Sequence, residues 1–349
     1  MRRPSTSRAA NVLSIQSHVV HGYVGNKAAV LPLQLLGIDV APLNSVHFSN
    51  HTGYAHGFKG EVLDGEALLA LVSGLEANGL LAGFTHLLTG YIGSESFLRA
   101  VLEVRRRITT ARGGEAPIWV CDPVLGDHGK LYVPPTLVEV YRADVMGLPS
   151  VITPNQFECE QLSGVTITDR ASALAACDVL HSKGVRTVLV TSATYSVPAL
   201  DSSGAEGSDA RVLRVLGSRD GTAFEIDVAS VDGSYTGTGD MVAALTLAWL
   251  HRSTADAPTA PAASAAPAAP APGATASAPA PAREAEEGDL ALAMENAVAT
   301  VQAVIARTPA GAELRLVESR FDIMDPPERF WRAARVVRAP PGGGTVSCT

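Results

Sequence analysis

Gly237-Thr238-Gly239-Asp240 leads directly into the apolar stretch Met241–Leu250, which has the length of a helix. Glycine has no Cβ atom, so a ligand can approach the backbone closely at such a turn. The first amides of a helix lack internal partners, and the helix dipole places partial positive charge there. The pattern therefore predicts a cup of N–H groups suited to phosphate oxygens. The expected task of Asp240 in this cup is to accept a proton from an attacking hydroxyl group; the alternative is a plain turn that Asp240 caps.

Short apolar runs alternate with helix-like stretches along most of the chain. This alternation is typical of a mostly parallel sheet with helices on both faces. The predicted strands cover residues 12–17, 39–46, 85–89, 118–121, 151–152 and 187–192, and the predicted helices cover 27–36, 66–78, 94–108, 157–162, 171–182, 241–250 and 288–307.

Polar side chains directly follow several of these apolar runs. In an open α/β sheet, ligands bind just outside the carboxyl ends of the strands. Residues far apart in the sequence are therefore expected to converge on one edge of the sheet. The residues that this rule brings together are Ser17, Asp122, Thr153, Asn155, Thr191 and Ser192.

The composition excludes some classes of protein. The 349 residues carry a formal net charge of −8, which argues against a nucleic-acid-binding protein with a basic face. No stretch has the length and purity of a transmembrane helix, so we expect no membrane partner. The four cysteines form no CxxC pair and show no metal-ligand spacing, and we expect reduced thiols in the cytoplasm; they are Cys121, Cys159, Cys177 and Cys348.

Three stretches are expected to lie outside the folded core. Residues 1–10 form a short basic leader that we expect to be disordered, with a fragment of a targeting signal as the alternative. Residues at about 253–287 are rich in Ala and Pro, which predicts a disordered insert between two helices of the same domain. Residues 339–349 are expected to form a disordered tail. Residues 11–338 are therefore expected to form one domain around the insert.

Several motifs occur in the order found in pyridoxal kinases of the ribokinase-like superfamily, and the chain resembles this family over about Val12 to Trp331. The glycine turn alone marks only the superfamily, whereas Leu13–Asn26 and Phe48–His56 are similar to pyridoxal kinases in particular. The other matching stretches are Leu88–Tyr91, Cys121–Asp127, Thr153–Glu158 and Gly237–Asp240, and Glu313–Val317 resembles the family's final strand region.

The resemblance implies a ribokinase-like three-layer αβα sandwich with a small lid, usually assembled as a homodimer. It also implies transfer of the γ-phosphoryl group of ATP to the 5′-hydroxyl of pyridoxal, pyridoxine or pyridoxamine. Asp240 would accept the hydroxyl proton, and the amides around Gly237, Thr238 and Gly239 would form the anion hole. Because a helix dipole favours a charged carboxylate at this end, we expect Asp240 to be a weak base.

The resemblance also assigns residues to the two substrates. The pyridine ring would lie against short hydroxyls and an apolar wall, as a flat heteroaromatic ring requires. The implied pyridoxal contacts are Ser17, Val46, Phe48, Thr52, Tyr91 and Asp240. The implied ATP contacts are Asp122, Asn155, Ser192, Val231, Asp232 and Thr238.

The resemblance implies two cations besides ATP. Asp122 and Asp127, with Glu158 directly or through water, would hold Mg²⁺, which prefers oxygen ligands; Zn²⁺ in its place is left open. Read without the family, both aspartates are equally consistent with turn residues. Thr153 and Thr191 would lie near a monovalent cation, K⁺ or Na⁺.

Two alternative functions remain at this point. One is a related kinase that acts on hydroxymethylpyrimidine, which a panel of substrates would distinguish. The other is a non-catalytic vitamin B6 carrier, but the intact Gly237–Asp240 turn and the intact acidic residues argue against it. The sequence leaves open the preferred vitamer, the preferred divalent metal and the role of the insert.

Overall fold

The computed structural model describes residues 10–195, 212–229, 231, 233, 235–255 and 289–338. Several sequence predictions lie outside the described residues: the leader up to residue 9, the insert over 256–287, the tail 339–349, Asp232 and Cys348. Two predicted boundaries are wrong. Ala10 is buried and belongs to the core, and residues 253–255 continue a helix in place of starting the insert.

The described strands form a ten-stranded central sheet in the order β12-β11-β10-β9-β8-β5-β4-β1-β2-β3. The central strands from β9 to β2 are parallel, so the predicted mostly parallel sheet is confirmed. Their bounds are β1 (Asn11–Val19), β2 (Asp39–Phe48), β3 (Gly60–Val62), β4 (His86–Thr89), β5 (Ile118–Cys121), β8 (Val151–Ile152), β9 (Thr187–Ala193), β10 (Val212–Arg219), β11 (Thr222–Ala229) and β12 (Arg335–Arg338).

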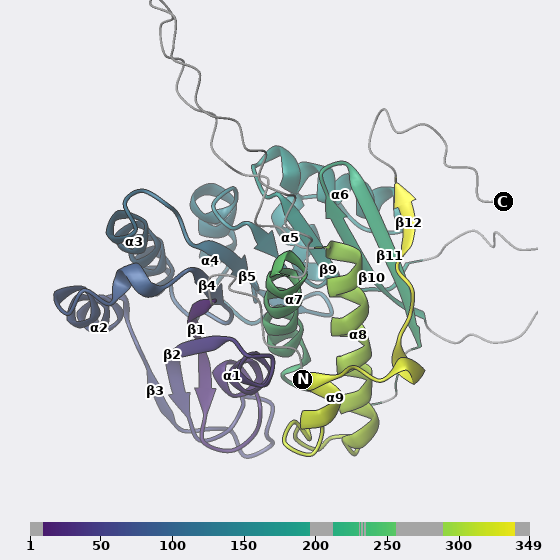
Figure 1. The fold of residues 1–349 in the computed structure, drawn as a ribbon, viewed down its shortest axis with the longest axis horizontal. Helices are drawn as coiled ribbons and strands as arrows, with labels where there is room; N and C mark the ends of the chain where they lie inside the picture. The colour runs from purple at the N-terminus through teal and green to yellow at the C-terminus, as the bar shows by residue number, and fades with distance from the viewer. Residues whose placement is uncertain are drawn as a thin grey trace, which may run out of the picture.

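Helices cover both faces of this sheet and complete a three-layer αβα sandwich (Figure 1). One face packs against α2 to α6 around a core that contains Phe97 and Trp119. The other face packs against α1, α7 and α8 through residues such as Leu33, Met241 and Val304. The bounds are α1 (Asn26–Leu35), α2 (Gly65–Ala77), α3 (Glu95–Ala111), α4 (Pro135–Val140), α5 (Gln156–Ser163), α6 (Arg170–Ser182), α7 (Thr238–Ala255), α8 (Leu290–Arg307) and α9 (Arg320–Met324), with short η1 (Leu81–Gly83), η2 (Tyr141–Val145) and η3 (Glu328–Phe330).

The antiparallel edge of the sheet was not predicted. β10 pairs with β9 and β11, and β11 pairs with β12. The β10–β11 turn is Asp220-Gly221, with both residues at positive φ (50° and 80°). An Asp-Gly pair between alternating apolar residues is a strong hairpin signal, so this turn could have been read from the sequence. Glu313–Val317, which the resemblance placed in a final strand region, is not a strand: these residues form a loop, and the last described strand is β12.

A short hairpin follows β5. β6 (Gly126–Asp127) pairs with β7 (Lys130–Leu131) in a separate two-stranded sheet. The turn between them contains His128 and Gly129, both at positive φ. The hairpin therefore projects from the segment that directly follows β5.

Helix α8 is long and apolar enough to cross a membrane by composition and length alone, and it is the one such helix among the described residues. However, 56% of the Leu290–Arg307 segment is buried inside the fold. Ala293, Ala297 and Val304 pack in the core shared with α7. This burial identifies α8 as a core helix of the sandwich.

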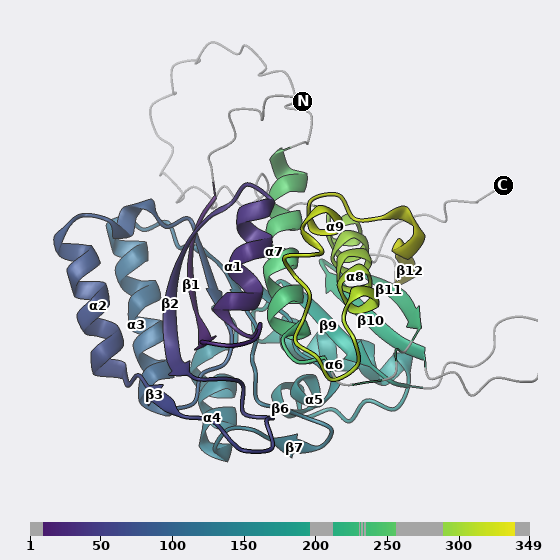
Figure 2. The same ribbon diagram turned by 90° about the horizontal axis from the view of Figure 1, so that it is seen from below.

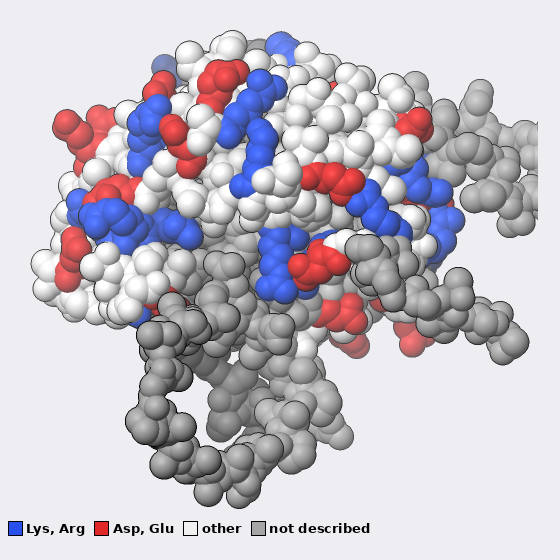
Figure 3. Space-filling model, turned by 90° about the horizontal axis from the view of Figure 1, so that it is seen from above, with Lys and Arg blue, Asp and Glu red and all other residues white. Residues whose placement is uncertain are grey.

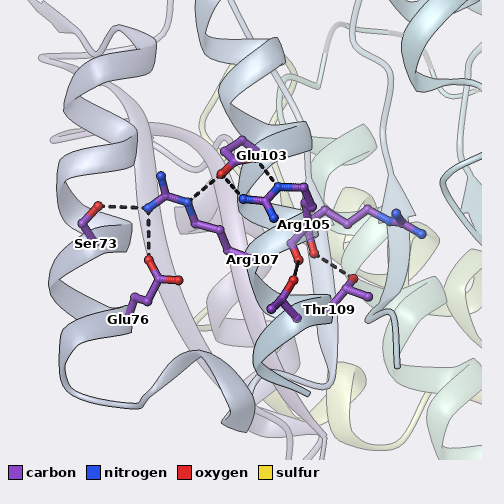
Figure 4. Close-up of polar contacts among 8 residues, drawn as sticks. Ser73, Glu76, Glu103, Arg105, Arg107 and Thr109 are labelled. Carbon is purple, nitrogen blue, oxygen red and sulfur yellow. Dashed lines mark hydrogen bonds and ion pairs between the residues drawn. The ribbon is translucent and has the colours of Figure 1, made fainter. Parts of the chain in front are cut away.

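Arg99, Arg106 and Arg107 of α3 are paired with acidic residues, whereas Arg105 Nε is buried without a hydrogen-bond partner among the described residues. Arg107 Nε donates to Glu103 Oε1 at 2.8 Å, and Arg107 Nη1 donates to Ser73 Oγ at 3.0 Å and Glu76 Oε2 at 3.2 Å on α2 (Figure 4). Basic and acidic side chains also lie side by side on the face that Figure 3 displays. Such pairing joins α2 to α3 and is unlike the continuous basic stripe of a nucleic-acid-binding face.

Candidate active site

The first turn of α7 lies against the loop that joins β1 to α1. The Gly25 amide donates to Asp240 Oδ2 at 2.8 Å. Gly237 has φ +92°, and a Cβ built there would lie 2.0 Å from the Tyr23 carbonyl oxygen. Gly25 has φ +53°, and a Cβ there would lie 2.1 Å from the Ser17 carbonyl oxygen. Glycine is therefore required at both positions, because only a bare backbone allows the two segments to approach this closely.

Asp240 lies inside the first turn of α7, since the helix begins at Thr238. Its carboxylate accepts a hydrogen bond from the distant Gly25 amide, unlike the simple helix cap considered as the alternative. Burial raises the pKa of Asp240 to about 6, and the Gly25 hydrogen bond opposes that shift. The expectation of a weak base is therefore wrong in this structure, because desolvation outweighs the stabilisation of the charged form at the helix end.

Asp122 lies close to both Glu158 and Asp240. A Cβ at Gly239 would lie 3.7 Å from Asp122 Oδ2, so the carboxylate faces the opening of α7. Burial, then the negative charges of Glu158 and Asp240, hold the pKa of Asp122 well above its usual range. Burial likewise raises the pKa of Glu158 to about 7, against the backbone hydrogen bonds that favour its charged form. These buried carboxylates repel one another, an arrangement that favours a cation or protons between them.

Glu158 is fixed by the start of α5. Its carboxylate accepts from the Asn155 amide and from the Leu125 amide, both at 2.9 Å. The Asn155 side chain accepts from the Glu158 amide at 2.9 Å in return, which completes a capping box. Asn155 Nδ2 also donates to the Gly126 carbonyl at 2.8 Å. This network joins α5 to the β6–β7 hairpin.

The predicted apolar wall forms a small cluster of its own at the carboxyl ends of β1 and β2. Val46 and Phe48 are buried together with Val19 and Val24, and Tyr91 packs against them. The Tyr91 carbonyl accepts from Ser45 Oγ at 3.0 Å, which positions the segment after β4. The structure therefore brings together three of the predicted pyridoxal contacts.

Two further predicted pyridoxal contacts lie at different depths. Ser17 is buried, and its Oγ lies 2.3 Å from where a Gly25 Cβ would stand, so it faces the β1–α1 loop. Thr52 is exposed on the loop between β2 and β3. Ser17 is therefore fixed within the fold, whereas Thr52 depends on the position of its loop.

The predicted nucleotide and cation residues lie at the ends of β8, β9 and α7. Thr153 is buried, and its side chain lies beside the Asp122 carboxylate, where hydrogen bonding opposes the rise in the pKa of Asp122. The Thr191 amide donates to the Pro154 carbonyl at 2.9 Å, and Ser192 is half-buried beside it. Thr238 Oγ1 donates to the Tyr235 carbonyl at 3.1 Å. Val231 is exposed, and Asp232 lies outside the described residues.

Asp127 lies apart from the deeper carboxylates. It is on the β6–β7 hairpin with a side chain 43% exposed, beside His128 Nε2 at 3.5 Å. Among the residues that the structure describes, no three or more His, Cys, Asp or Glu side chains gather as a metal site. The described cysteines, Cys121, Cys159 and Cys177, are free and buried.

Sequence reasoning missed the tertiary roles of two residues at this edge. Gly25 was quoted only as part of a motif, although its amide contacts Asp240. Glu313 accepts hydrogen bonds from Tyr23 N and Tyr54 Oη, which are 290 and 259 residues away. No local pattern could have indicated such contacts, because they depend on how the chain folds back.

Comparison with known proteins places this geometry among small-molecule kinases. The family described as phosphomethylpyrimidine kinase matches residues 84–265. A pyridoxal kinase of Arabidopsis thaliana is 40% identical over 338 residues, which cover 92% of this chain and 93% of the relative. The pyridoxal kinase of Homo sapiens is 38% identical over 343 residues, which cover 90% of this chain and 95% of the relative.

A solved structure has the same architecture. The pyridoxal kinase of Leishmania donovani in complex with ADP and pyridoxamine matches with a TM-score of 0.74 and 34% sequence identity. The match covers 95% of this chain and 99% of that chain. The ribokinase-like fold expected from the sequence is therefore confirmed.

Proposed function

The chain belongs to the pyridoxal kinase family of ATP-dependent kinases, and from this premise we propose how its residues carry out the transfer to the 5′-hydroxyl of pyridoxal. The observation that carries the proposal is the buried carboxylate of Asp240, held by the Gly25 amide at 2.8 Å in the first turn of α7. A pKa of about 6 suits a group that must be ionised near neutral pH and still accept a proton.

Asp240 accepts the proton of the 5′-hydroxyl as its oxygen attacks the γ-phosphorus of ATP. The amides at Gly237, Thr238 and Gly239 stabilise the charge on the equatorial phosphoryl oxygens. Phosphoryl transfer requires little covalent chemistry from the protein, so positioning and charge stabilisation provide most of the rate. The close approach of Tyr23 to Gly237 fixes the direction of this turn.

The residues present fit a divalent cation. Asp122 and Glu158 are buried oxygen donors with raised pKa values, which is the state expected of metal ligands without their positive charge. Bound Mg²⁺, or Zn²⁺, would neutralise phosphate charge. Asp127 would join from the hairpin, through water or after the hairpin moves inward.

Pyridoxal would lie against the wall of Val46, Phe48 and Tyr91, with Ser17 and Thr52 contacting its polar groups. ATP would extend from the α7 turn toward the ends of β8 and β9. The proposed nucleotide contacts are Asp122, Asn155, Ser192, Val231, Asp232 and Thr238. The position of two threonines at the carboxyl ends of β8 and β9 supports a monovalent cation, K⁺ or Na⁺, near Thr153 and Thr191.

We further propose that residues 10–338 form one kinase domain, with the insert after residue 255 and both termini outside it. The protein is proposed to be a cytoplasmic homodimer, in keeping with the family resemblance and the buried free thiols of the described cysteines. Light scattering coupled to size exclusion would measure the mass directly. A monomeric mass at micromolar concentration would contradict the dimer.

The function is tested by measuring ADP release with pyridoxal, pyridoxine, pyridoxamine and hydroxymethylpyrimidine as acceptors. We expect turnover with the vitamin B6 compounds at rates at least about tenfold above the pyrimidine, because the chain is 40% identical to a pyridoxal kinase over most of its length. A preference for hydroxymethylpyrimidine would support the alternative of a hydroxymethylpyrimidine kinase. The matching family is described as phosphomethylpyrimidine kinase, so this alternative is tested directly. Binding of pyridoxal without ADP release would support the carrier.

A further inference from the structure

The loop between α8 and α9 crosses the carboxyl edge of the sheet beside the start of α7 (Figure 2). Leu314 and Leu316 are buried and fix this loop in the core around α7. Leu314 Cδ1 would lie 3.4 Å from a Cβ at Gly237. The residue before Leu314, Glu313, is therefore held at the candidate active site by its neighbours.

Glu313 contacts two loops that are distant in sequence. Its Oε2 accepts from the Tyr23 amide at 3.0 Å. Its Oε1 accepts from Tyr54 Oη at 2.8 Å and lies 3.4 Å from His51 Nε2. The Glu313 side chain is only 15% exposed, whereas its partner Tyr54 is 41% exposed; hydrogen bonds to an ionised carboxylate are stronger than those between neutral groups.

The contact between the β1–α1 loop and the Glu313 carboxylate also depends on Gly22. Gly22 has φ +99°, and a Cβ there would lie 2.4–2.5 Å from the carboxylate atoms of Glu313. The β1–α1 loop can therefore close on Glu313 only because residue 22 has no side chain.

Of the two loops that Glu313 joins, one contacts the proposed base and the other lies beside the proposed acceptor site. The loop with Tyr23 continues to Gly25, whose amide holds Asp240. The loop with His51 and Tyr54 follows Phe48 and carries Thr52. Glu313 therefore links the segment that orients the base to the segment that encloses the acceptor ring.

We propose that Glu313 is a positioning residue that fastens the 49–59 loop and the 20–25 loop together over the phosphoryl acceptor. This inference rests on the proposed function. Glu313 acts through its neighbours: it sets where Thr52 and Phe48 meet the acceptor and where Gly25 meets Asp240. Its loss mainly affects the acceptor, since none of its described contacts involves a proposed nucleotide residue.

The test compares Glu313→Ala, Glu313→Gln, Tyr54→Phe and the double variant Glu313→Ala/Tyr54→Phe. We expect Glu313→Ala to raise KM for pyridoxal about tenfold, with KM for ATP within about twofold. Glu313→Gln should restore most of the affinity, because its amide can accept from Tyr23 N and donate to Tyr54 Oη. The double variant should resemble Glu313→Ala, since both changes break one shared contact.

Glu318→Ala is the matched control, because Glu318 lies on the same segment and, among the described residues, forms an ion pair with exposed Arg315. Hydrogen exchange provides a readout that needs no turnover: Glu313→Ala should increase exchange in both 20–25 and 49–59. Unchanged exchange, or an equal loss of affinity for ATP and pyridoxal, would overturn the proposal. A natural protein without turnover would overturn the proposed function, while the exchange result would still decide whether Glu313 joins the loops.

Discussion

The Gly25 amide and the Asp240 carboxylate form a 2.8 Å hydrogen bond between positions 215 residues apart. The bond joins the turn after the first strand to the first turn of α7, and Gly25 also contacts the end of β1 at Ser17. The proposed base is therefore oriented by a backbone group whose position requires a glycine. Mutation of Gly25 tests the position of this loop, whereas mutation of Asp240 tests the chemistry of the carboxylate.

Gly25→Ala should remove nearly all turnover and destabilise the fold by about 2–4 kcal/mol. The new Cβ would lie 2.1 Å from the Ser17 carbonyl at φ +53°, so the loop must move away from Asp240. Gly74→Ala is the control, because Gly74 lies within α2 with nothing within 4 Å of its Cβ position. The control should keep full activity, and its free energy of unfolding should rise by up to about 1 kcal/mol. Normal turnover in Gly25→Ala would show that the position of this loop is not required for catalysis.

Asp240→Asn should make the unliganded protein more stable at pH 8, by about 1–3 kcal/mol. The pKa of Asp240 is raised from 3.8 to about 6 in the fold. A raised pKa contributes stability that is complete below pH 3.8 and is lost as the pH rises through 6. The variant avoids that loss. Its free energy of unfolding, measured by urea denaturation, should therefore exceed that of the natural protein by more at pH 8 than at pH 5. An advantage independent of pH would show that Asp240 is not the titrating group.

Asn155→Ala should lower the free energy of unfolding by about 1–2 kcal/mol and should also raise KM for ATP. The change breaks the capping box with Glu158 and frees the Gly126 carbonyl of the hairpin. Asp169→Ala is the matched control, because Asp169 forms a capping box with Ser172 at the start of α6. Both variants should lose similar stability in urea denaturation, and only Asn155→Ala should change KM for ATP. Equal KM values would remove Asn155 from the nucleotide site.

Glu103→Gln should weaken the ion pairs within α3 and lower the free energy of unfolding by about 0.5–1 kcal/mol without affecting turnover. Hydrogen bonds from Arg106 and Arg107 lower the pKa of Glu103 from 4.5 to about 2, and Figure 4 shows the bond between Arg107 and Glu103. A lowered pKa contributes stability that is present above pH 4.5 and is lost as the pH falls through 2. Denaturation at pH 7 and pH 3 should therefore show a smaller difference between the variant and the natural protein at pH 3. A constant difference would indicate a packing effect.

The sequence predicted the central sheet and most helices, because strand ends and glycine turns are local patterns. β1, β4 and β5 appear where apolar runs end in polar residues. The β10–β11 hairpin was missed although Asp220-Gly221 provides a local signal. The raised pKa of Asp240 and the contacts of Glu313 could not be predicted, since burial and contacts across 290 residues arise only from the assembled fold.

The central claim is that Asp240 accepts the proton of the pyridoxal 5′-hydroxyl. The most direct measurement is pyridoxal 5′-phosphate formation from pyridoxal, ATP, Mg²⁺ and K⁺ by the natural protein and by Asp240→Asn. The asparagine keeps an acceptor for the Gly25 amide, so the fold should persist while kcat falls at least about 100-fold. Turnover that is unchanged in the folded variant would contradict the role of Asp240 as the base and leave positioning and charge stabilisation as the source of catalysis.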